Sequence, residues 1–290
     1  MSTAPATLFP PDDGALVDDV PETARCLQCE TPLAGPFCHT CGQHESVAEQ
    51  LTFRSLWHHF RVRRLNLDRG LPRTVLDVVR DPGAVARTFV EGKRQTYTHP
   101  ITLLFLAYAA YALVYGLFDE QLHAMMREQV ERQLAGSMPA DAASDPAMEQ
   151  ALVMMEATVE VLFTYGAYFT VFIILPFAGA LRWLLADRGR SMAECAVFGA
   201  YVEAAVVLPS MALFLPLSVW LRSPALSSAG LVLYLVYAGI GARSFFDRRP
   251  GSVGLSVLSV ILGLVVYLGL FLVIAFGYGI WVGATQAHAG

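Results

Sequence analysis

The sequence predicts an all-α polytopic membrane protein, and three observations support this fold class. Of the 290 residues, 55% are hydrophobic and only 16% are charged, whereas about 25% of the residues in an average soluble domain are charged. The apolar residues gather in five long stretches. If each stretch crosses a membrane once, most basic residues lie in segments on the same side of it. The apolar content argues against a soluble monomer, and the net charge of −5 argues against a nucleic-acid-binding protein.

Each of the five apolar stretches is a candidate membrane span. A helix needs about 20 mostly apolar residues to cross a bilayer core of roughly 30 Å, because it rises about 1.5 Å per residue. We expect five transmembrane helices, at about residues 101–118, 158–181, 195–221, 224–242 and 254–282. The first stretch is short, so its helix should begin at Pro100 or earlier. Residues 1–100 and 119–157 are too few to bury all five stretches in a soluble core.

The distribution of Lys and Arg predicts the orientation of the chain. Cytoplasmic flanks of membrane spans carry an excess of these residues. Seventeen of the twenty fall in residues 1–100, 182–194 and 243–253. We therefore expect a multi-pass membrane protein with a cytoplasmic N-terminus and the C-terminus outside. The first 20 residues are acidic and have no apolar core, so no cleavable signal peptide is expected.

The predicted outer loop, residues 119–157, is strongly acidic, with eight Asp or Glu residues and two Arg. Its charge is consistent with topology control and solubility on the outer face. Capture of a cation is the alternative interpretation, although His123 is the sole histidine in the loop.

Four cysteines near the N-terminus have the spacing of a metal-binding ribbon. Two CxxC pairs, Cys26/Cys29 and Cys38/Cys41, are separated by eight residues. This spacing lets four thiolates surround one tetrahedral ion, so residues 25–44 are predicted to form a zinc ribbon with structural Zn²⁺. Iron in a similar four-thiol site, two disulfides or an unligated loop are the alternatives. We expect Gly35 and Gly42 to supply permissive backbone, His39 and His44 to be solvated, and Cys195 to pack in the third span.

The flanks of the ribbon differ in charge. Residues 1–24 are expected to form a disordered acidic leader, and residues 45–99 a basic amphipathic segment at the membrane interface. Residues 50–99 hold ten basic and four acidic side chains. At helical spacing, one apolar stripe contains Phe53, Leu56, Trp57, Phe60, Leu67 and Leu71. This stripe fits a helix lying on lipid and fits equally well a helix packed on the rest of the protein.

A short helix is predicted before the first span. Asp81 is the expected N-cap, Pro82 the first helical residue and Gly92 the residue that ends the helix. The next segment leads into the span, and we expect its side chains, with Trp57, to contact lipid or a partner: Lys93, Arg94 and Tyr97.

Several of these segments resemble a family of uncharacterised bacterial membrane proteins, domain of unknown function 3667. The resemblance covers roughly residues 26–105 and rests on FCHTCGQ, LDRGLPRT, the Asp81-Pro82-Gly83 turn and EGKRQTYTHP. It implies a short N-terminal zinc ribbon fused to a polytopic membrane domain without an established activity. A weaker architectural resemblance, in span number and a cytoplasmic N-terminus, is to Yip-type five-span proteins.

Glu203 is the ionisable residue expected deepest in the membrane, about 12 Å into the third span. It has two interpretations. It could line an ion or proton path opened by Pro209 and Pro216. Alternatively, a protonated carboxyl group could bond to a Tyr or Ser of a neighbouring helix and hold the bundle together, which we favour because no other charged residue lies mid-span.

The sequence thus favours a non-enzymatic integral membrane adaptor or scaffold. In it, the ribbon or the basic linker recognises an unknown protein partner or membrane lipid. The alternative is a small transporter or channel that uses Glu203. A membrane enzyme acting on lipid would need a catalytic motif, and we recognise none of the familiar ones. Small residues four apart in the last span, Ser259 with Gly263 and Gly279 with Gly283, would permit close helix packing and a homo-oligomer.

Overall fold

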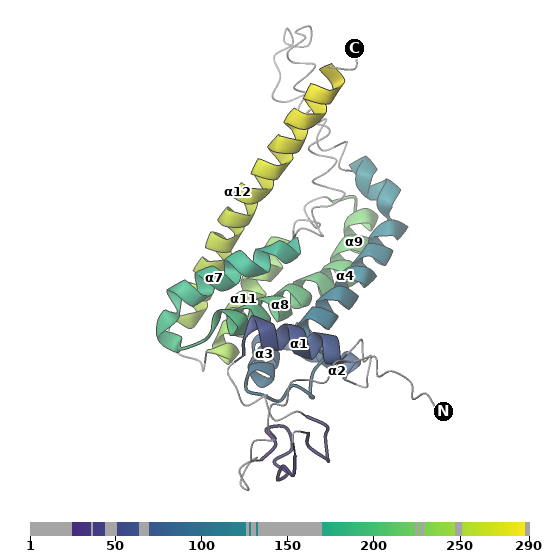
Figure 1. Ribbon diagram of the computed structural model, residues 1–290. Coiled ribbons are helices and arrows are strands. Elements are labelled where there is room, and N and C mark those ends of the chain that lie inside the picture. The colour runs from purple at the N-terminus through teal and green to yellow at the C-terminus, as the bar shows by residue number, and fades with distance from the viewer. Residues whose placement is uncertain are drawn as a thin grey trace, which may run out of the picture. The chain divides into compact units, whose positions relative to one another are not determined.

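We describe a computed structural model of the chain (Figure 1). The described residues are 25–35, 37–43, 51–63, 70–125, 128, 132, 170–223, 226, 229–246 and 251–287. Contacts divide the chain into two compact units, Met1–Glu49 and Gln50–Gly290, which we treat separately. Within the described residues the regular structure is helical, and the β-pairing found there is one isolated bridge between Arg25 and Pro32. The predicted leader and most of the predicted outer loop lie outside them.

Three helices among the described residues are long and apolar enough to cross a membrane. They are α4 (Pro100–Leu117), the continuous helix Met192–Trp220, and Ser252–Ile274 within α12 (Ser252–Ala287). Two shorter apolar helices, Val171–Leu184 and Ala229–Phe245, occupy the places of the second and fourth predicted spans. Residues 158–169, the first part of the predicted second span, lie outside the described residues. The prediction of membrane-spanning helices is confirmed, whereas the number five is not.

The first span begins where the sequence predicts. Pro100 is the first residue of α4 and His99 its N-cap, and proline suits this position because it needs no backbone N–H there. The second predicted span is represented by η3 (Thr170–Ile173) and α7 (Ile174–Leu184), followed by the turn η4 (Ala186–Arg188).

The helix α8 (Met192–Pro209) forms the centre of the second unit. A capping box starts it: the Glu194 backbone N–H donates to Ser191 Oγ at 3.2 Å, and the Ser191 N–H donates to Glu194 Oε2 at 3.0 Å. Every residue from Cys195 to Leu208 is buried. The helix packs against α4, α7 and α11 (Ala229–Phe245), as well as against two short N-terminal helices. Its glycine and alanine residues are small and permit this close packing.

The helix Met192–Trp220 contains a π-helical turn. Residues Ser210–Phe214 (η5) lie between α8 and α9 (Leu215–Trp220). Two prolines flank the turn, Pro209 and Pro216, and each removes a backbone donor from the helical ladder. The wider turn accommodates the missing bonds without ending the helix.

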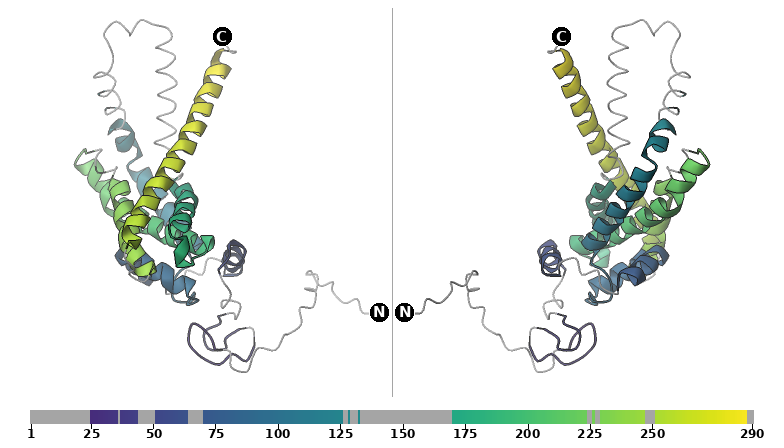
Figure 2. Two further views of the ribbon diagram at one scale, coloured as in Figure 1. Left: turned by 90° about the vertical axis from the view of Figure 1, so that its left-hand side faces the viewer. Right: turned by 90° about the vertical axis from the view of Figure 1, so that its right-hand side faces the viewer.

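Three short helices precede the first span: α1 (Phe53–Arg63), α2 (Leu71–Arg80) and α3 (Pro82–Val90). We call them the cap. Figures 1 and 2 show the cap at the end of the helical unit where α4 and α12 begin. The predicted apolar stripe from Phe53 to Leu71 is therefore split between α1 and α2, and Leu67 lies outside the described residues.

The predicted ends of α3 are confirmed. The Ala84 backbone N–H donates to Asp81 Oδ1 at 3.0 Å, Pro82 is the first helical residue, and Gly92 has φ of +96°. Val85 and Phe89 are buried.

The cap is attached to α11 by a direct backbone crossing. A Cβ atom added to Gly83 would overlap the Gly241 carbonyl group and lie 2.7 Å from Gly241 Cα. Beside this crossing the Ser244 hydroxyl donates to Asp81 Oδ2. The Asp-Pro-Gly turn thus starts a helix and also docks it, because its carboxyl group caps α3 with one oxygen and binds α11 with the other.

Candidate metal centre

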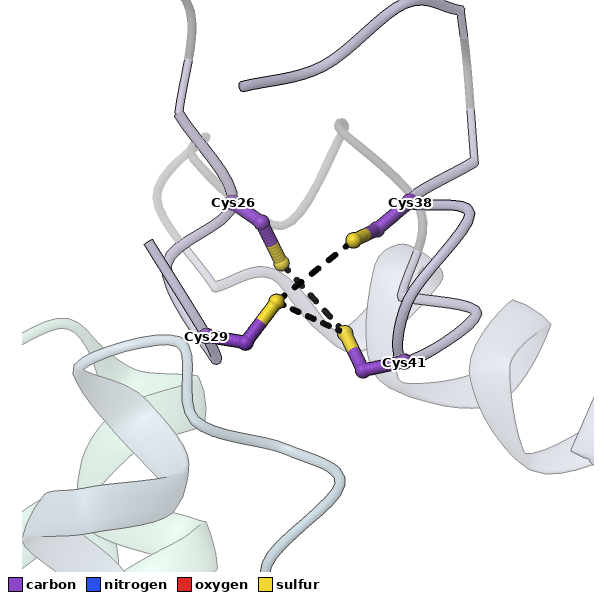
Figure 3. A group of neighbouring side chains, drawn as sticks. All are labelled: Cys26, Cys29, Cys38 and Cys41. Carbon is purple, nitrogen blue, oxygen red and sulfur yellow. Dashed lines mark hydrogen bonds between the residues drawn. The ribbon is translucent and has the colours of Figure 1, made fainter. Parts of the chain in front are cut away.

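The four predicted ligands converge in the first unit. The sulfurs of Cys26 and Cys41 are 3.5 Å apart, those of Cys29 and Cys38 are 3.5 Å apart, and those of Cys29 and Cys41 are 3.6 Å apart (Figure 3). All four lie within 4.8 Å of one another. In a disulfide the sulfurs would be about 2.05 Å apart, so the cluster is one of free thiols, in agreement with the state of all five cysteines.

The two CxxC segments have the same backbone structure, shifted by twelve residues. In the first, Cys26 N–H donates to Thr31 O and Glu30 N–H donates to Cys26 O; in the second, Cys38 N–H donates to Gln43 O and Gly42 N–H donates to Cys38 O. These four bonds measure 2.8 to 2.9 Å. Each segment is a tight turn that directs both sulfurs to one point, so the pairing follows from local hydrogen bonds.

The equivalence of the turns identifies a residue that the sequence analysis missed. Gly42 has φ of +73°, and the residue twelve positions earlier, Glu30, has φ of +59°. The permissive backbone predicted for Gly42 is present, whereas Gly35 is not among the residues with positive φ. Glu30 thus occupies a left-handed position that costs a side-chain-bearing residue about 1 kcal/mol. A glutamate in the fifth position of the first turn had concealed the repeat.

The sulfur positions fit one tetrahedral metal ion. Zinc bound to four thiolates has bonds of about 2.3 Å, which place the sulfurs about 3.8 Å apart. The three separations given above are within a few tenths of an ångström of that value. Thiolates are soft ligands that favour zinc or iron over calcium or magnesium. Four sulfurs would fill the coordination shell, so the cluster could hold a metal ion without leaving a position for substrate.

The thiol of Cys29 has a lowered pKa, which favours the thiolate form that binds metal ions. Hydrogen bonds with the Thr31 side chain, 3.3 Å away at Oγ1, and with the Thr31 backbone lower the pKa of Cys29 to about 6. Removal from water raises the pKa of Cys41 to about 12. Backbone hydrogen bonds also lower the pKa of Cys38. At neutral pH the Cys29 sulfur is therefore a thiolate before a metal binds, and a bound ion must displace any protons that the other sulfurs carry. His39 is exposed, as expected, and His44 lies outside the described residues.

The other predicted contact residues lie in and beside the cap. Trp57 on α1 is 54% exposed and Lys93 is exposed. Arg94 is only 5% exposed, with its guanidinium carbon 5.8 Å from the centre of the Phe89 ring, and burial lowers its pKa to about 10. This position differs from the exposed one that we expected, because the side chain packs against α3. Lipid contact by Arg94 stays a prediction that its burial disfavours.

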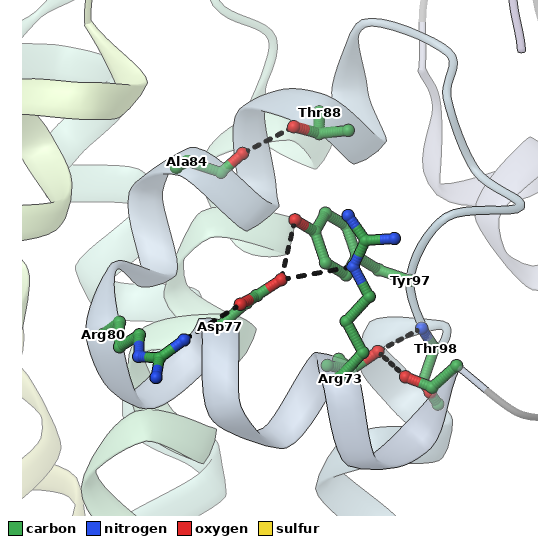
Figure 4. A network of polar contacts seen from close by, with 9 residues as sticks. Arg73, Asp77, Arg80, Ala84, Thr88, Tyr97 and Thr98 are labelled. Atoms are coloured by element: carbon green, nitrogen blue, oxygen red, sulfur yellow. Dashed lines mark hydrogen bonds and ion pairs between the residues drawn. The ribbon is translucent and has the colours of Figure 1, made fainter.

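Tyr97 joins a polar network that links α2 to the segment before α4 (Figure 4). Its hydroxyl donates to Asp77 Oδ2 at 3.2 Å, and Arg73 Nε lies 3.5 Å from the same oxygen. The Thr98 backbone N–H donates to Thr74 Oγ1 at 3.0 Å, and the Tyr201 hydroxyl on α8 donates to Thr98 O at 2.8 Å. These bonds connect α2, the segment before α4, and α8. Tyr97 therefore has a structural role in addition to any contact with lipid or a partner.

Glu203 lies inside the helical unit and is 2% exposed. The Tyr108 hydroxyl on α4 donates a hydrogen bond to Glu203 Oε1. This is the partner type that we expected if Glu203 holds neighbouring helices together. Cys195 is also buried in α8. Of the tryptophans beyond the cap, Trp183 and Trp220 are exposed near helix ends, and the side chain of Trp281 lies outside the described residues.

Long apolar helices and a four-cysteine cluster define the class of the protein: a helical, membrane-like protein with a candidate metal-binding unit. Residues 68–112 match the family described as "Protein of unknown function (DUF3667)", which confirms the predicted family resemblance there. The match contains α2, α3 and the first part of α4, and it does not include the cysteine cluster. No curated protein and no solved structure matches the chain. Bacterial origin and the Yip-type resemblance stay predictions.

Proposed function

We propose that the protein is a non-enzymatic integral membrane adaptor or scaffold, in which a zinc-loaded ribbon recognises a protein partner and the helices hold it at the bacterial inner membrane. One observation carries this proposal: the four sulfurs converge within a unit, Met1–Glu49, that is separate from the unit with the candidate spans. A separate unit with its own metal can bind a partner without disturbing the helices.

The chemistry of the cluster supports recognition over catalysis. A zinc ion held by four thiolates has no open position for water or substrate, and its binding energy stabilises the fold around it. Two large apolar side chains on the same small unit are exposed, Leu27 and Phe37, the latter by 60%. A protein partner that binds the ribbon could cover these side chains and remove their apolar surface from water.

The five-span topology, with a cytoplasmic N-terminus and the C-terminus outside, belongs to this proposal. It requires both shorter apolar helices, Val171–Leu184 and Ala229–Phe245, to cross with the three longer ones. Basic residues near the ends of these helices support it: Arg182 and Arg243 are exposed in their last turns. Trp183, also exposed, suits a headgroup position beside Arg182.

Metal analysis and crosslinking of the full chain in native membranes test the proposal. We expect about one zinc ion per chain, and crosslinks between the ribbon and a protein partner. Cys38→Ser should lose both. The matched control, Cys195→Ala, changes a cysteine outside the cluster and should keep both. Phe37→Ser should keep the zinc and lose the crosslinks. Disulfides or iron in the wild type would refute the zinc ribbon, and unchanged crosslinks in Phe37→Ser and Cys38→Ser would refute the adaptor.

A further inference from the structure

The helix α1 is tied at both ends to the first residues of two candidate spans. At its N-terminal side, Ser191 Oγ, which caps α8, donates to Leu51 O at 3.1 Å. Near its C-terminal end, the Phe60 ring lies 5.8 Å from the ring of His99, the N-cap of α4. The helix α1 therefore lies beside the start of both α4 and α8. Figure 1 shows α1 at the lower end of the helical unit, near the start of α4.

The protein covers only part of the apolar face of α1. Leu56 is 7% exposed and Phe60 is half-buried, so this edge packs on the helical unit. Phe53 and Trp57, four residues apart on the neighbouring edge, are 47% and 54% exposed. Two adjacent large aromatic side chains at the start of the spans are placed where indole and phenyl rings favour lipid headgroups.

The charge of α1 indicates which lipids it would contact. The helix sequence FRSLWHHFRVR contains three arginines and no acidic residue. Arg54, the residue after Phe53 in the sequence, is exposed. Arg182, in the last turn of α7, is also exposed, beside the exposed Trp183. Each basic residue near an anionic bilayer contributes about 1 kcal/mol of attraction.

We propose that α1 is an interfacial helix that docks on anionic lipid of the membrane crossed by the spans, with Phe53 and Trp57 inserted among the headgroups and Arg54 at the lipid phosphates. The occupant of this face is the bilayer because the face lies at the start of α4 and α8, combines aromatic with basic side chains, and carries no opposing charge. This inference concerns the helical unit and does not depend on the metal or the partner of the ribbon.

Depth-dependent quenching of Trp57 tests the docking. In the full chain, Trp183, Trp220 and Trp281 are replaced by Phe, and the protein is reconstituted in phosphatidylcholine vesicles with or without phosphatidylglycerol. We expect lipids brominated near the headgroup to quench Trp57 more than lipids brominated near the chain ends, and iodide in the water to quench it little. If the triple variant does not fold, the difference between wild type and Trp57→Phe provides the same readout.

The charge contribution is tested with Arg54→Gln. In vesicles with phosphatidylglycerol, this variant should reduce the ratio of docked to undocked helix about fivefold, and in neutral vesicles the reduction should be smaller. Arg222→Gln is the control, because Arg222 follows α9 at the other end of the continuous helix. Free access of iodide to Trp57 would overturn the proposal. Protection from both iodide and brominated lipid would also overturn it, because the ribbon or a second copy would then cover the face.

Discussion

The hydroxyl of Tyr108 on α4 donates a hydrogen bond to the carboxyl group of Glu203 on α8, inside the helical unit. The two residues are 95 positions apart in the sequence. A polar pair within a membrane bundle resists separation of its helices, because each partner alone would face apolar surroundings. The arrangement favours a structural role for Glu203 over a role in transport.

This pair predicts a coupled loss of stability. Tyr108→Phe should lower the free energy of unfolding in detergent by about 1 kcal/mol, and Glu203→Ala should lower it more because it also leaves a cavity. In Glu203→Ala, the further change Tyr108→Phe should cost almost nothing, since the bond is already absent. A double-mutant cycle of unfolding measures the coupling. Ion or proton flux that wild-type proteoliposomes support and Glu203→Gln proteoliposomes lose would contradict the structural interpretation.

The low pKa of Cys29 predicts how many protons leave when the metal binds. The pKa of Cys29 is about 6. At a pH above this value the sulfur is already a thiolate, and at a lower pH the metal must displace a further proton. Zinc binding at pH 5 should therefore release about one proton more than at pH 7, and the apparent zinc affinity should fall as the pH decreases. Proton release into weakly buffered solution, followed during zinc titration, provides the measurement.

Thr31→Val is the matched variant for this proton count. It removes the side-chain hydrogen bond that contributes most to the low pKa of Cys29, so more protons should leave at pH 7 and the difference between the two pH values should shrink. If Thr31→Val shows the same difference in proton release between pH 5 and pH 7 as the wild type, Cys29 is not the source of that difference.

The repeated turns predict opposite effects at two equivalent positions. Glu30 and Gly42 both have positive φ, a region that glycine enters without cost. Glu30→Gly should stabilise the apo ribbon, and Gly42→Ala should destabilise it, each by about 1 kcal/mol. Resistance of bound zinc to a chelator should change in the same directions. A loss of stability in Glu30→Gly would contradict the equivalence of the turns.

The crossing of α3 and α11 predicts a large effect of one methyl group. Gly83→Ala should force the backbones apart and destabilise the helical unit by about 3 kcal/mol, because its Cβ would overlap the Gly241 carbonyl group. Gly254→Ala is the control, since a Cβ there has no heavy atom within 4 Å. Thermal unfolding in detergent compares the two, and equal stability of Gly83→Ala and wild type would exclude the close approach.

Features that depend on neighbouring residues could be predicted from the sequence. Asp81 and Gly92 flank α3 as expected, because an N-cap side chain bonds to a backbone N–H within the same helical turn. The four cysteines were recognised because two short turns suffice to bring each pair together. The start of α4 at Pro100 and the end of α9 at Trp220 follow from the limits of long apolar stretches. The left-handed Glu30 was missed because its residue type does not indicate that conformation.

The sequence by itself determined that the chain contains helices apolar enough to cross a membrane, which residues could bind a metal, and how the family-matched turn starts its helix. Only the tertiary structure decided that Arg94 is buried, that Tyr97 binds Asp77, that Gly83 crosses Gly241 and that Tyr108 pairs with Glu203. The physical reason is the sequence distance over which each interaction acts. Hydropathy, helix caps and CxxC turns act over a few residues, whereas these contacts join separate elements and depend on how the helices pack.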